Sequence, residues 1–359
     1  MNVTLCGLIR FLVKASFLKV SDEYLQSARV SSVYPLVLIL LIIIRPVRYI
    51  QQQEKDGKEM KNIQVYHVDA FTNVPFRGNP AGVVPEADRL TEEEMKNIAK
   101  ELNLSETAFL FSSNQSEHDF RVRYFTPTDE MDFCGHATVG LSWLLATTYG
   151  WQDKTKQIRL ETNIGTVPVE LATENQNLTA VTMTQVPPKV KDIQTDPGEI
   201  ARLAGISPEA LDQRYPIKLA YTGNWHLIVP VKSQKEIDAA RPQIEELKTL
   251  NQIQKASTTH LFTFNTTEPG YDLYTRDFGP AVGIQEDPVT GSANGALAGY
   301  LAMEGILPLQ HRHQLKIAQG HTMGRPGTLF VTVTKGNKPV IQVGGSAVIT
   351  ISGTLRLPE

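Results

Sequence analysis

The alternation of apolar and polar residues along the chain predicts many short strands and a few helices. Residues 91–102 open with Thr91 and three glutamates, which is a capping-box start, and continue with apolar residues at the three-to-four spacing of a buried helix face. Elsewhere, short apolar runs between turn residues predict strands. The expected strands are 65–70, 108–111, 120–124, 157–162, 167–171, 180–183, 217–221, 226–231, 259–264, 271–276, 315–318, 328–332, 340–343 and 347–351.

Three further helices are expected where apolar segments end near turn residues. The helix that follows Gly135 is ended by Gly150. A shorter helix is capped by Asp196 and stopped by Gly205. A third helix begins with the glycine and serine at 291 and 292. The expected ranges are 136–148, 197–203 and 291–303.

Residues 1–61 do not fit this pattern. Their longest apolar run, 36–44, has nine residues, and even the fifteen uncharged residues between Arg29 and Arg45 fall short of the roughly 20 that span a bilayer. No small-residue cleavage site follows, which argues against a secretory signal. We interpret the segment as a leader that arises from an upstream start codon. A short membrane-associating segment and an additional core helix are the alternatives, and membrane contact is not expected.

The composition and the absent motifs exclude several classes of protein but do not indicate a function. With 359 residues, of which 41% are hydrophobic and 20% charged, the chain is long enough for two domains. A net charge of −3 provides no general basic field, so no nucleic-acid partner is expected. The sequence lacks the motifs of phosphate-binding loops, serine hydrolases and zinc proteases.

Histidines and cysteines give no metal or disulfide signal. His311, His313 and His321 come without an acidic ligand close in the sequence, so a solvated loop is favoured and no metal site is expected. The two cysteines, Cys6 and Cys134, do not make a disulfide framework.

Glu106 is the most informative polar residue, because it lies between the expected helix 91–102 and the expected strand 108–111. A carboxylate at such a junction is expected to be partly desolvated. Desolvation favours the neutral form, raises the pKa and allows one group to take and return a proton near neutral pH. The alternative is an ordinary glutamate at a helix end or on the surface.

Two segments of the chain share one arrangement. Residues 126–140 and 285–301 each contain an acidic turn with a proline, then a glycine beside a small or polar residue, then an apolar helix. The start of a helix exposes backbone N–H groups that bind anions. If the two starts face each other, they would bind a small carboxylate and bring His136, Asp287 and Ser292 around it. The alternative is two ordinary glycine-rich helix starts.

Eight short motifs, taken in order, resemble the phenazine-biosynthesis PhzF-like isomerases, and the resemblance extends from about residue 62 to the C-terminus. One motif alone would be weak, but eight in the order of the family are specific. They are VDAFT (68–72), GNPAGVV (78–84), SETAF (105–109), FTP (125–127), FCGHAT (133–138), TGNWHL (222–227), EDPVTGSA (286–293) and GRPG (324–327).

The resemblance implies an α+β protein with the diaminopimelate-epimerase-like fold. In this fold two pseudo-symmetric lobes each have a bent, mainly antiparallel sheet around a central helix, and the site lies between them. The proline-containing, linker-like stretch 187–197 is the expected boundary. The lobes would be residues 62–186 and 187–359, and the last strands would be able to return to the first lobe. A cytoplasmic homodimer is also implied.

The same resemblance implies a chemistry. The founding reaction of the family isomerises a dihydro-hydroxyanthranilate without a metal or an organic cofactor, and the glutamate of the SET motif, here Glu106, moves a proton between two carbons. The substrate expected here is a small carboxylate. The other implied site residues are catalytic His136 and Asp287 and substrate-binding Ser292, Gly135, Gly291 and Asn79. Asn224 and His226 are further candidate contacts.

Two other functions stay open. Related epimerases use two thiols, but here only Cys134 lies at a helix start, and Ser292 at the other start has far too high a pKa to replace a thiolate without a base. An amino-acid racemase or epimerase is therefore disfavoured. A non-catalytic small-molecule binder would have no reason to keep a desolvated Glu106. We therefore expect a cofactor-independent isomerase.

Overall fold

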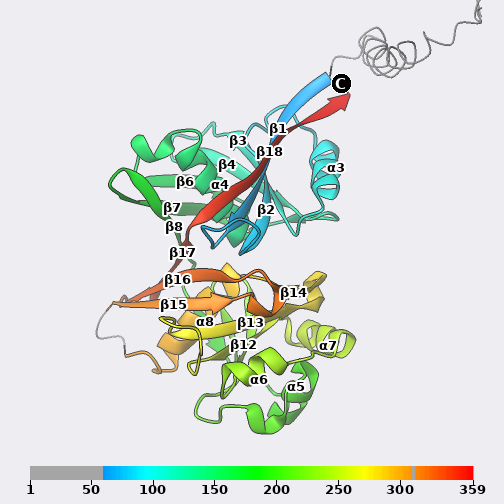
Figure 1. The fold of residues 1–359 in the computed structure, drawn as a ribbon, viewed down its shortest axis with the longest axis vertical. Coiled ribbons are helices and arrows are strands. Elements are labelled where there is room, and N and C mark those ends of the chain that lie inside the picture. The colour runs from blue at the N-terminus through cyan, green and yellow to red at the C-terminus, as the bar shows by residue number, and fades with distance from the viewer. Residues whose placement is uncertain (1–59, 309–311, 359) are drawn as a thin grey trace, which may run out of the picture. The chain divides into compact units, whose positions relative to one another are not determined.

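The computed structural model describes residues 60–308 and 312–358, which form strands and a few helices (Figure 1). By internal contacts the chain divides into two units, Asn62–Arg356 and a smaller unit made of Met1–Lys61 with Leu357–Glu359. The leader expected at 1–61 lies outside the described residues except for Met60 and Lys61.

The described part of the chain contains eighteen strands that form one continuous mixed sheet. The strands are β1 (Met60–Ala70), β2 (Asn79–Val84), β3 (Thr107–Ser112), β4 (Phe120–Phe125), β5 (Glu130–Met131), β6 (Gln157–Thr162), β7 (Gly165–Glu174), β8 (Asn177–Thr184), β9 (Lys189–Lys191), β10 (Lys218–Tyr221), β11 (Trp225–Pro230), β12 (Thr258–Thr263), β13 (Leu273–Gly279), β14 (Ile284–Asp287), β15 (His313–Gln319), β16 (Gly327–Thr334), β17 (Val340–Gly345) and β18 (Ala347–Pro358). The α-helices are α3 (Glu92–Leu102), α4 (Gly135–Thr147), α5 (Pro197–Ala204), α6 (Gln234–Ala239), α7 (Ile244–Gln254) and α8 (Gly291–Met303).

Two apolar helices, α4 and α8, are the central elements of the core. Both have thirteen residues, and nearly every one of these residues is buried. A helix that is apolar on all sides must be surrounded by other elements. Accordingly, α4 packs against β2, β3 and β8, whereas α8 packs against β9, β10, β11, β16 and β17 (Figure 1).

Long-range strand pairs connect the parts of the sheet around these helices. Strand β17 pairs with β8, with Val343 opposite Met183. The last strand, β18, pairs with β1, the first described strand. The side chain of Thr350 in β18 donates a hydrogen bond to the carbonyl of His67 in β1. Segments from opposite ends of the chain therefore lie side by side (Figure 1).

The apolar core consists of two clusters of buried side chains. The larger cluster includes Leu141 and Leu144 of α4 and Leu297 and Leu301 of α8. The smaller one lies among α5, α7 and the strands β10 to β13. Each fully buried leucine contributes about 1.5–3 kcal/mol relative to an exposed one, so the larger cluster holds both central helices in place.

Most expected elements are present, and the exceptions are informative. Helix α3 begins with the expected capping box, in which Thr91 Oγ1 accepts a hydrogen bond from the Glu94 amide and the Glu94 side chain accepts one from the Thr91 amide. Strand β2 and the helices α6 and α7 were not expected. The stretch 187–197 was expected to be a linker, but this is wrong for Lys189–Lys191, which form β9 and pair with β10.

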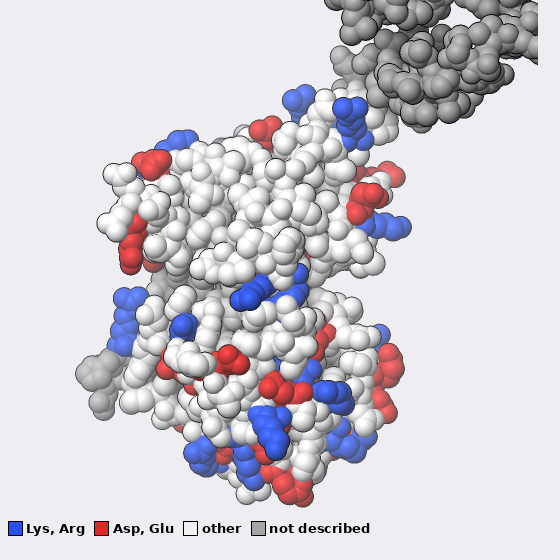
Figure 2. Space-filling view, in the orientation of Figure 1, with Lys and Arg blue, Asp and Glu red and all other residues white. Residues whose placement is uncertain are grey.

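The surface gives two further observations. On the face shown in Figure 2, lysines and arginines are interspersed with aspartates and glutamates, so no broad region of one sign covers this face.

Within residues 60–308 and 312–358, no helix is both long enough and apolar enough to cross a bilayer.

Candidate active site

A cavity of about 210 Å³ lies among the starts of α4 and α8, the residue before β3 and the strands β11 to β13. The site residues expected from the sequence that line it are Glu106, His136, Asp287, Ser292, Gly135 and Gly291. Asn224 and His226 line it as well. Residues that lie up to about 190 positions apart in the sequence therefore line one cavity.

Glu106 and His136 form a close pair in this cavity. Glu106 is 5% exposed and immediately precedes β3, whereas His136 is in the first turn of α4. Their closest atoms, Glu106 Oε2 and His136 Nε2, are 3.2 Å apart. Ser105 Oγ lies 3.4 Å from the same ring nitrogen. His136 is therefore the ionisable neighbour of the buried carboxylate, whose Oε2 makes no hydrogen bond among the described residues.

Asn79 lies behind the cavity wall instead of lining it. Its side-chain nitrogen donates hydrogen bonds to Asp287 Oδ1 at 2.8 Å and to the Val289 carbonyl at 2.9 Å. The same nitrogen is 3.3 Å from His136 Nδ1. Both hydrogens of this amide are used in those two hydrogen bonds, so the contact with His136 does not determine which ring nitrogen carries the proton. Asn79 thus orients Asp287 and lies against His136.

Asp287 ends β14 and is the third acidic or basic group of the site. Its Oδ2 accepts a hydrogen bond from Thr290 Oγ1 at 2.6 Å. Part of its side-chain surface faces the open cavity, yet desolvation by the surrounding protein raises the pKa of Asp287 to about 6, against the lowering effects of His136 and Thr290. This carboxyl can therefore change its protonation state in the physiological range.

The two helix starts present backbone donors without side-chain caps. Cys134 and Thr290 occupy the positions before the helices, and neither side chain caps its helix. The first N–H groups of a helix lack intrahelical partners, and the helix dipole adds positive potential there. Because Gly135, Gly291 and Ser292 line the same cavity, these starts can bind a carboxylate in it.

Cys134 is buried beside His136, with Sγ 3.5 Å from Nδ1. Burial, with the negative charge of Glu106, raises the pKa of the thiol well above its usual value. The thiol is therefore neutral at physiological pH and is a poor base for a thiol-dependent epimerase. Three residues of the cavity could together hold a metal ion, namely Glu106, Cys134 and His136. One possible ligand atom from each lies within 4.8 Å of the other two, and the structure has no other such group among its described residues.

His313 and His321, two of the histidines noted in the sequence, do not line this cavity. His313 Nε2 is 2.6 Å from the carbonyl of Pro308, and His311 lies outside the described residues. His321 Nε2 is 3.5 Å from Glu268 Oε2. Folding brings Glu268 to His321 from a distant part of the chain, a contact that the local sequence does not show.

A chain of buried polar groups in the wall of the cavity was not expected from the sequence. His226 Nδ1 is 2.7 Å from Thr258 Oγ1, which donates to Asp277 Oδ1 at 2.6 Å. His260 Nδ1 is 3.0 Å from the same carboxylate oxygen. Polar residues inside the apolar runs of β12 and β13 were the available signal for this cluster.

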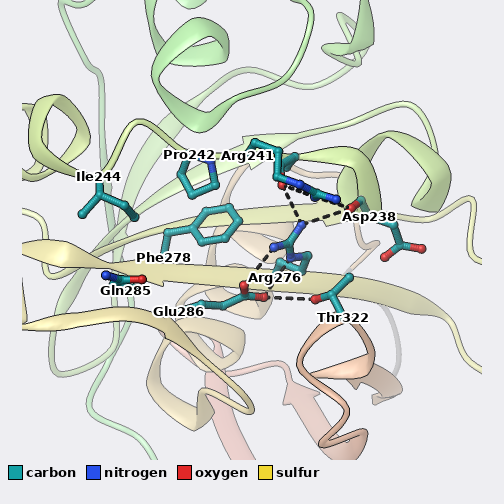
Figure 3. A pocket seen from close by; sticks show the side chains of 10 residues that line it. Asp238, Arg241, Pro242, Ile244, Arg276, Phe278, Gln285, Glu286 and Thr322 are labelled. Atoms are coloured by element: carbon teal, nitrogen blue, oxygen red, sulfur yellow. Dashed lines mark hydrogen bonds and ion pairs between the residues drawn. The ribbon is translucent and has the colours of Figure 1, made fainter.

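A larger cavity, of about 490 Å³, opens beside the connection between α6 and α7 (Figure 3). Its buried Arg276 donates from Nε and Nη2 to the two oxygens of Glu286, each at 2.8 Å. Nη1 donates to the Ile237 carbonyl at 2.8 Å. Arg276 and Glu286 are therefore paired with each other, whereas the smaller cavity gathers the site residues expected from the sequence. The smaller cavity is for this reason the candidate active site.

Comparison with known proteins finds relatives along most of the chain. The sequence model of the phenazine biosynthesis-like proteins matches residues 68–353. An uncharacterized isomerase of Clostridium acetobutylicum is 35% identical over 305 residues, which cover 83% of this chain and 99% of that protein. The trans-2,3-dihydro-3-hydroxyanthranilate isomerase of Pseudomonas chlororaphis is 32% identical over 293 residues, covering 81% and 98% of the two chains.

A solved structure is similar as well. It is the phenazine biosynthesis protein of the PhzF family from Bacillus anthracis, with 37% sequence identity and a TM-score of 0.76. The match covers 82% of this chain and 99% of the other. This likeness confirms the expected α+β fold.

Proposed function

This chain belongs to the phenazine biosynthesis-like family and is an isomerase, and from that premise we propose that it moves a proton between two carbons of a small carboxylate substrate. The observation that carries the proposal is the buried Glu106 beside His136 in a cavity that both helix starts also line. We further propose that Glu106 is the single acid and base and that no metal or organic cofactor takes part.

In this mechanism Glu106 first acts as the base. Its carboxylate takes a proton from a saturated carbon next to a conjugated system, and the electron pair left on that carbon shifts to the far end of the system. The carboxyl then gives the proton to the far carbon, so that no proton or electron is gained or lost overall. One carboxyl can serve in both steps because the proton it takes stays on it within the buried site.

The neighbouring groups stabilise the charge that develops. His136 Nε2 lies 3.2 Å from Glu106 Oε2 and, when it carries a proton, provides a donor for a substrate oxygen or nitrogen. Asp287, held by Asn79 and Thr290, orients an amine or hydroxyl of the substrate. Ser292 and the two helix starts bind the substrate carboxylate, where fixed backbone donors need no rearrangement during the reaction.

Hydrogen exchange at carbon tests this proposal. The first compound to test is trans-2,3-dihydro-3-hydroxyanthranilate, followed by other small cyclic carboxylates, each incubated with the enzyme in D₂O. Glu106→Gln keeps the size of the side chain but cannot take a proton, so turnover and carbon exchange should fall at least about 100-fold, with ligand affinity within a few fold. Glu101→Gln, the same change at an exposed position of α3, is the matched control. Near-normal turnover by Glu106→Gln would refute the assignment.

The remaining expectations are part of the same proposal. We propose a homodimer in the cytoplasm, and two lobes that meet near residue 187. Sedimentation of the purified protein tests the assembly, and a monomer at micromolar concentration would contradict it.

A further inference from the structure

His226 of β11 lines the cavity, and its Nε2 has no hydrogen-bond partner among the described residues. The residue is 1% exposed. Buried polar groups are almost always hydrogen-bonded, so an unpartnered ring nitrogen at a cavity indicates a ligand atom. The proposed proton shift makes no use of this nitrogen.

The hydrogen bonds behind His226 determine where its ring proton lies. Thr258 donates its hydroxyl proton to Asp277 Oδ1, so the Thr258 oxygen, 2.7 Å from His226 Nδ1, can only accept from that ring. Nδ1 therefore carries the proton. In a neutral imidazole the other nitrogen, Nε2, then keeps a free electron pair.

The charges of the buried groups agree with this tautomer. Burial opposes the ionisation of Asp277, but its hydrogen bonds and electrostatic interactions, chiefly with His260, outweigh burial and hold its pKa below the usual value. An ionised Asp277 must accept from Thr258. Burial lowers the pKa of His226 to about 4, so the ring is neutral at physiological pH.

The sheet holds these residues in register. His226 is directly opposite Thr258 in the parallel pair β11–β12, and His260 is opposite Asp277 in the antiparallel pair β12–β13. Backbone hydrogen bonds of three adjacent strands therefore fix the positions of the groups. A site built on strands in this way keeps its geometry before a ligand arrives.

We propose that His226 recognises the substrate by accepting at Nε2 a hydrogen bond from a hydroxyl or amine group, with Thr258 and Asp277 as positioning residues. The inference rests on the proposed isomerase function, because it concerns how the same cavity selects its ligand. A carbonyl or carboxylate oxygen at this point would face another acceptor and leave both unpaired. His226 therefore selects for a donor.

Nitrogen-15 NMR of the full-length protein tests the tautomer without a substrate. The His226 signals are assigned by their loss in His226→Asn. We expect Nδ1 to have the shift of a protonated nitrogen and Nε2 that of an unprotonated nitrogen over about pH 5 to 8. Thr258→Val, which removes the hydroxyl, should give a mixture of tautomers. A proton on Nε2 in the unmutated protein would overturn the proposal.

Two ligands that differ by one hydroxyl, 3-hydroxyanthranilate and anthranilate, test the recognition. The unmutated protein should bind the hydroxylated compound about fivefold tighter, the effect of one hydrogen bond. His226→Asn keeps a donor for Thr258 but has no acceptor at the position of Nε2, so the ratio should fall to about one. His226→Gln can place its amide oxygen there and should restore part of the ratio. Equal binding by the unmutated protein, or an unchanged ratio in His226→Asn, would overturn the proposal.

The outcome separates this inference from the proposed function. Glu106→Gln should abolish carbon exchange and leave the ligand ratio intact, because Glu106 is not part of the His226 chain. Loss of carbon exchange in Glu106→Gln with no effect of His226→Asn on the ratio would overturn the inference alone. Normal exchange in Glu106→Gln would overturn the proposed function alone.

Discussion

At the scale of single residues, Asp287 links stability to pH. Its carboxyl has a pKa of about 6 in the folded protein against an ordinary value of 3.8. A group whose pKa is raised by folding stabilises the fold when protonated. This contribution is fully present below about pH 3.8 and is lost as the pH rises through about 6.

Asp287→Asn should therefore stabilise the protein at neutral pH while it impairs turnover. The amide oxygen can still accept from Asn79, but no buried charge forms. We expect a gain of about 1–2 kcal/mol in the free energy of unfolding, a value reduced for partial exposure of the group. Urea titrations at about pH 7.5 and about pH 4 measure it. A gain of equal size at both values of pH would show that the ionisation of Asp287 is not the cause.

Cys134 provides a test of thiol chemistry. Because its thiol is neutral, Cys134→Ala should keep carbon exchange within a few fold of the unmutated protein. Serial dialysis against EDTA should likewise leave turnover unchanged, since the proposed mechanism uses Glu106 alone. Deuterium incorporation measured by mass spectrometry is the readout for both experiments. A loss above about 100-fold in either would favour a thiol-based or metal-dependent reaction.

At the scale of elements, glycines with left-handed backbone end two helical segments in different surroundings. Gly205 follows α5 with φ 71°, and a Cβ there would lie 1.9 Å from the Arg241 carbonyl oxygen. Gly150 follows α4 and its C-cap, with φ 68°, and a Cβ there would meet nothing within 4 Å. A side chain at either position would strain the left-handed backbone. Only at Gly205 would it also clash with a neighbouring residue.

Alanine at each position separates these two effects. Gly150→Ala should destabilise the protein by about 1–2 kcal/mol, the cost of a left-handed backbone alone. Gly205→Ala should cost a further 1–3 kcal/mol or so, because the Arg241 backbone must move. Unfolding in guanidinium chloride measures both. Equal losses would contradict the steric argument.

Element type was predictable where local chemistry determines it. The capping box of α3 and the apolar runs of α4 and α8 each depend on residues that are close together in the sequence. The bounds of these helices were predicted to within about two residues. Helix α7 was missed because its sequence is mostly polar and its buried residues are few. Strand β2 was missed because Asn79, Pro80 and the following glycine are typical of turns, whereas pairing with β1 and β3 makes the segment a strand.

The candidate site was partly predictable for a similar reason. The glycine-rich helix starts and Glu106 lie in recognisable motifs, and the structure brings them to one cavity. The hydrogen bond between His226 and Thr258 depends instead on the register of two strands, which no short motif encodes. Asn79 was expected to touch substrate; its side chain is bonded to Asp287 and Val289 and is not among the groups that line the cavity, so its contact with substrate stays a prediction.

At the scale of the whole molecule, the packed unit Asn62–Arg356 carries its own internal contacts. A chain that starts at Met60 keeps all of β1, including the buried Ile63 and Val65. We expect it to be folded and to melt within about 2 °C of the full chain, because no described core residue is lost. Differential scanning calorimetry measures the difference. Aggregation or a markedly lower melting temperature would show that residues 1–59 contribute to the fold.

The pairing of β18 with β1 has a consequence for the order of events during synthesis. The chain emerges from the ribosome N-terminus first, at about 5–20 residues per second, so β1 is made well before its neighbour β18 exists. Contacts between such distant segments also form slowly, because a long loop must close first. Until the last residues leave the ribosome, one edge of β1 lacks its partner and is open to wrong pairing. A nascent chain of this protein should therefore depend on chaperones until its final strand is released.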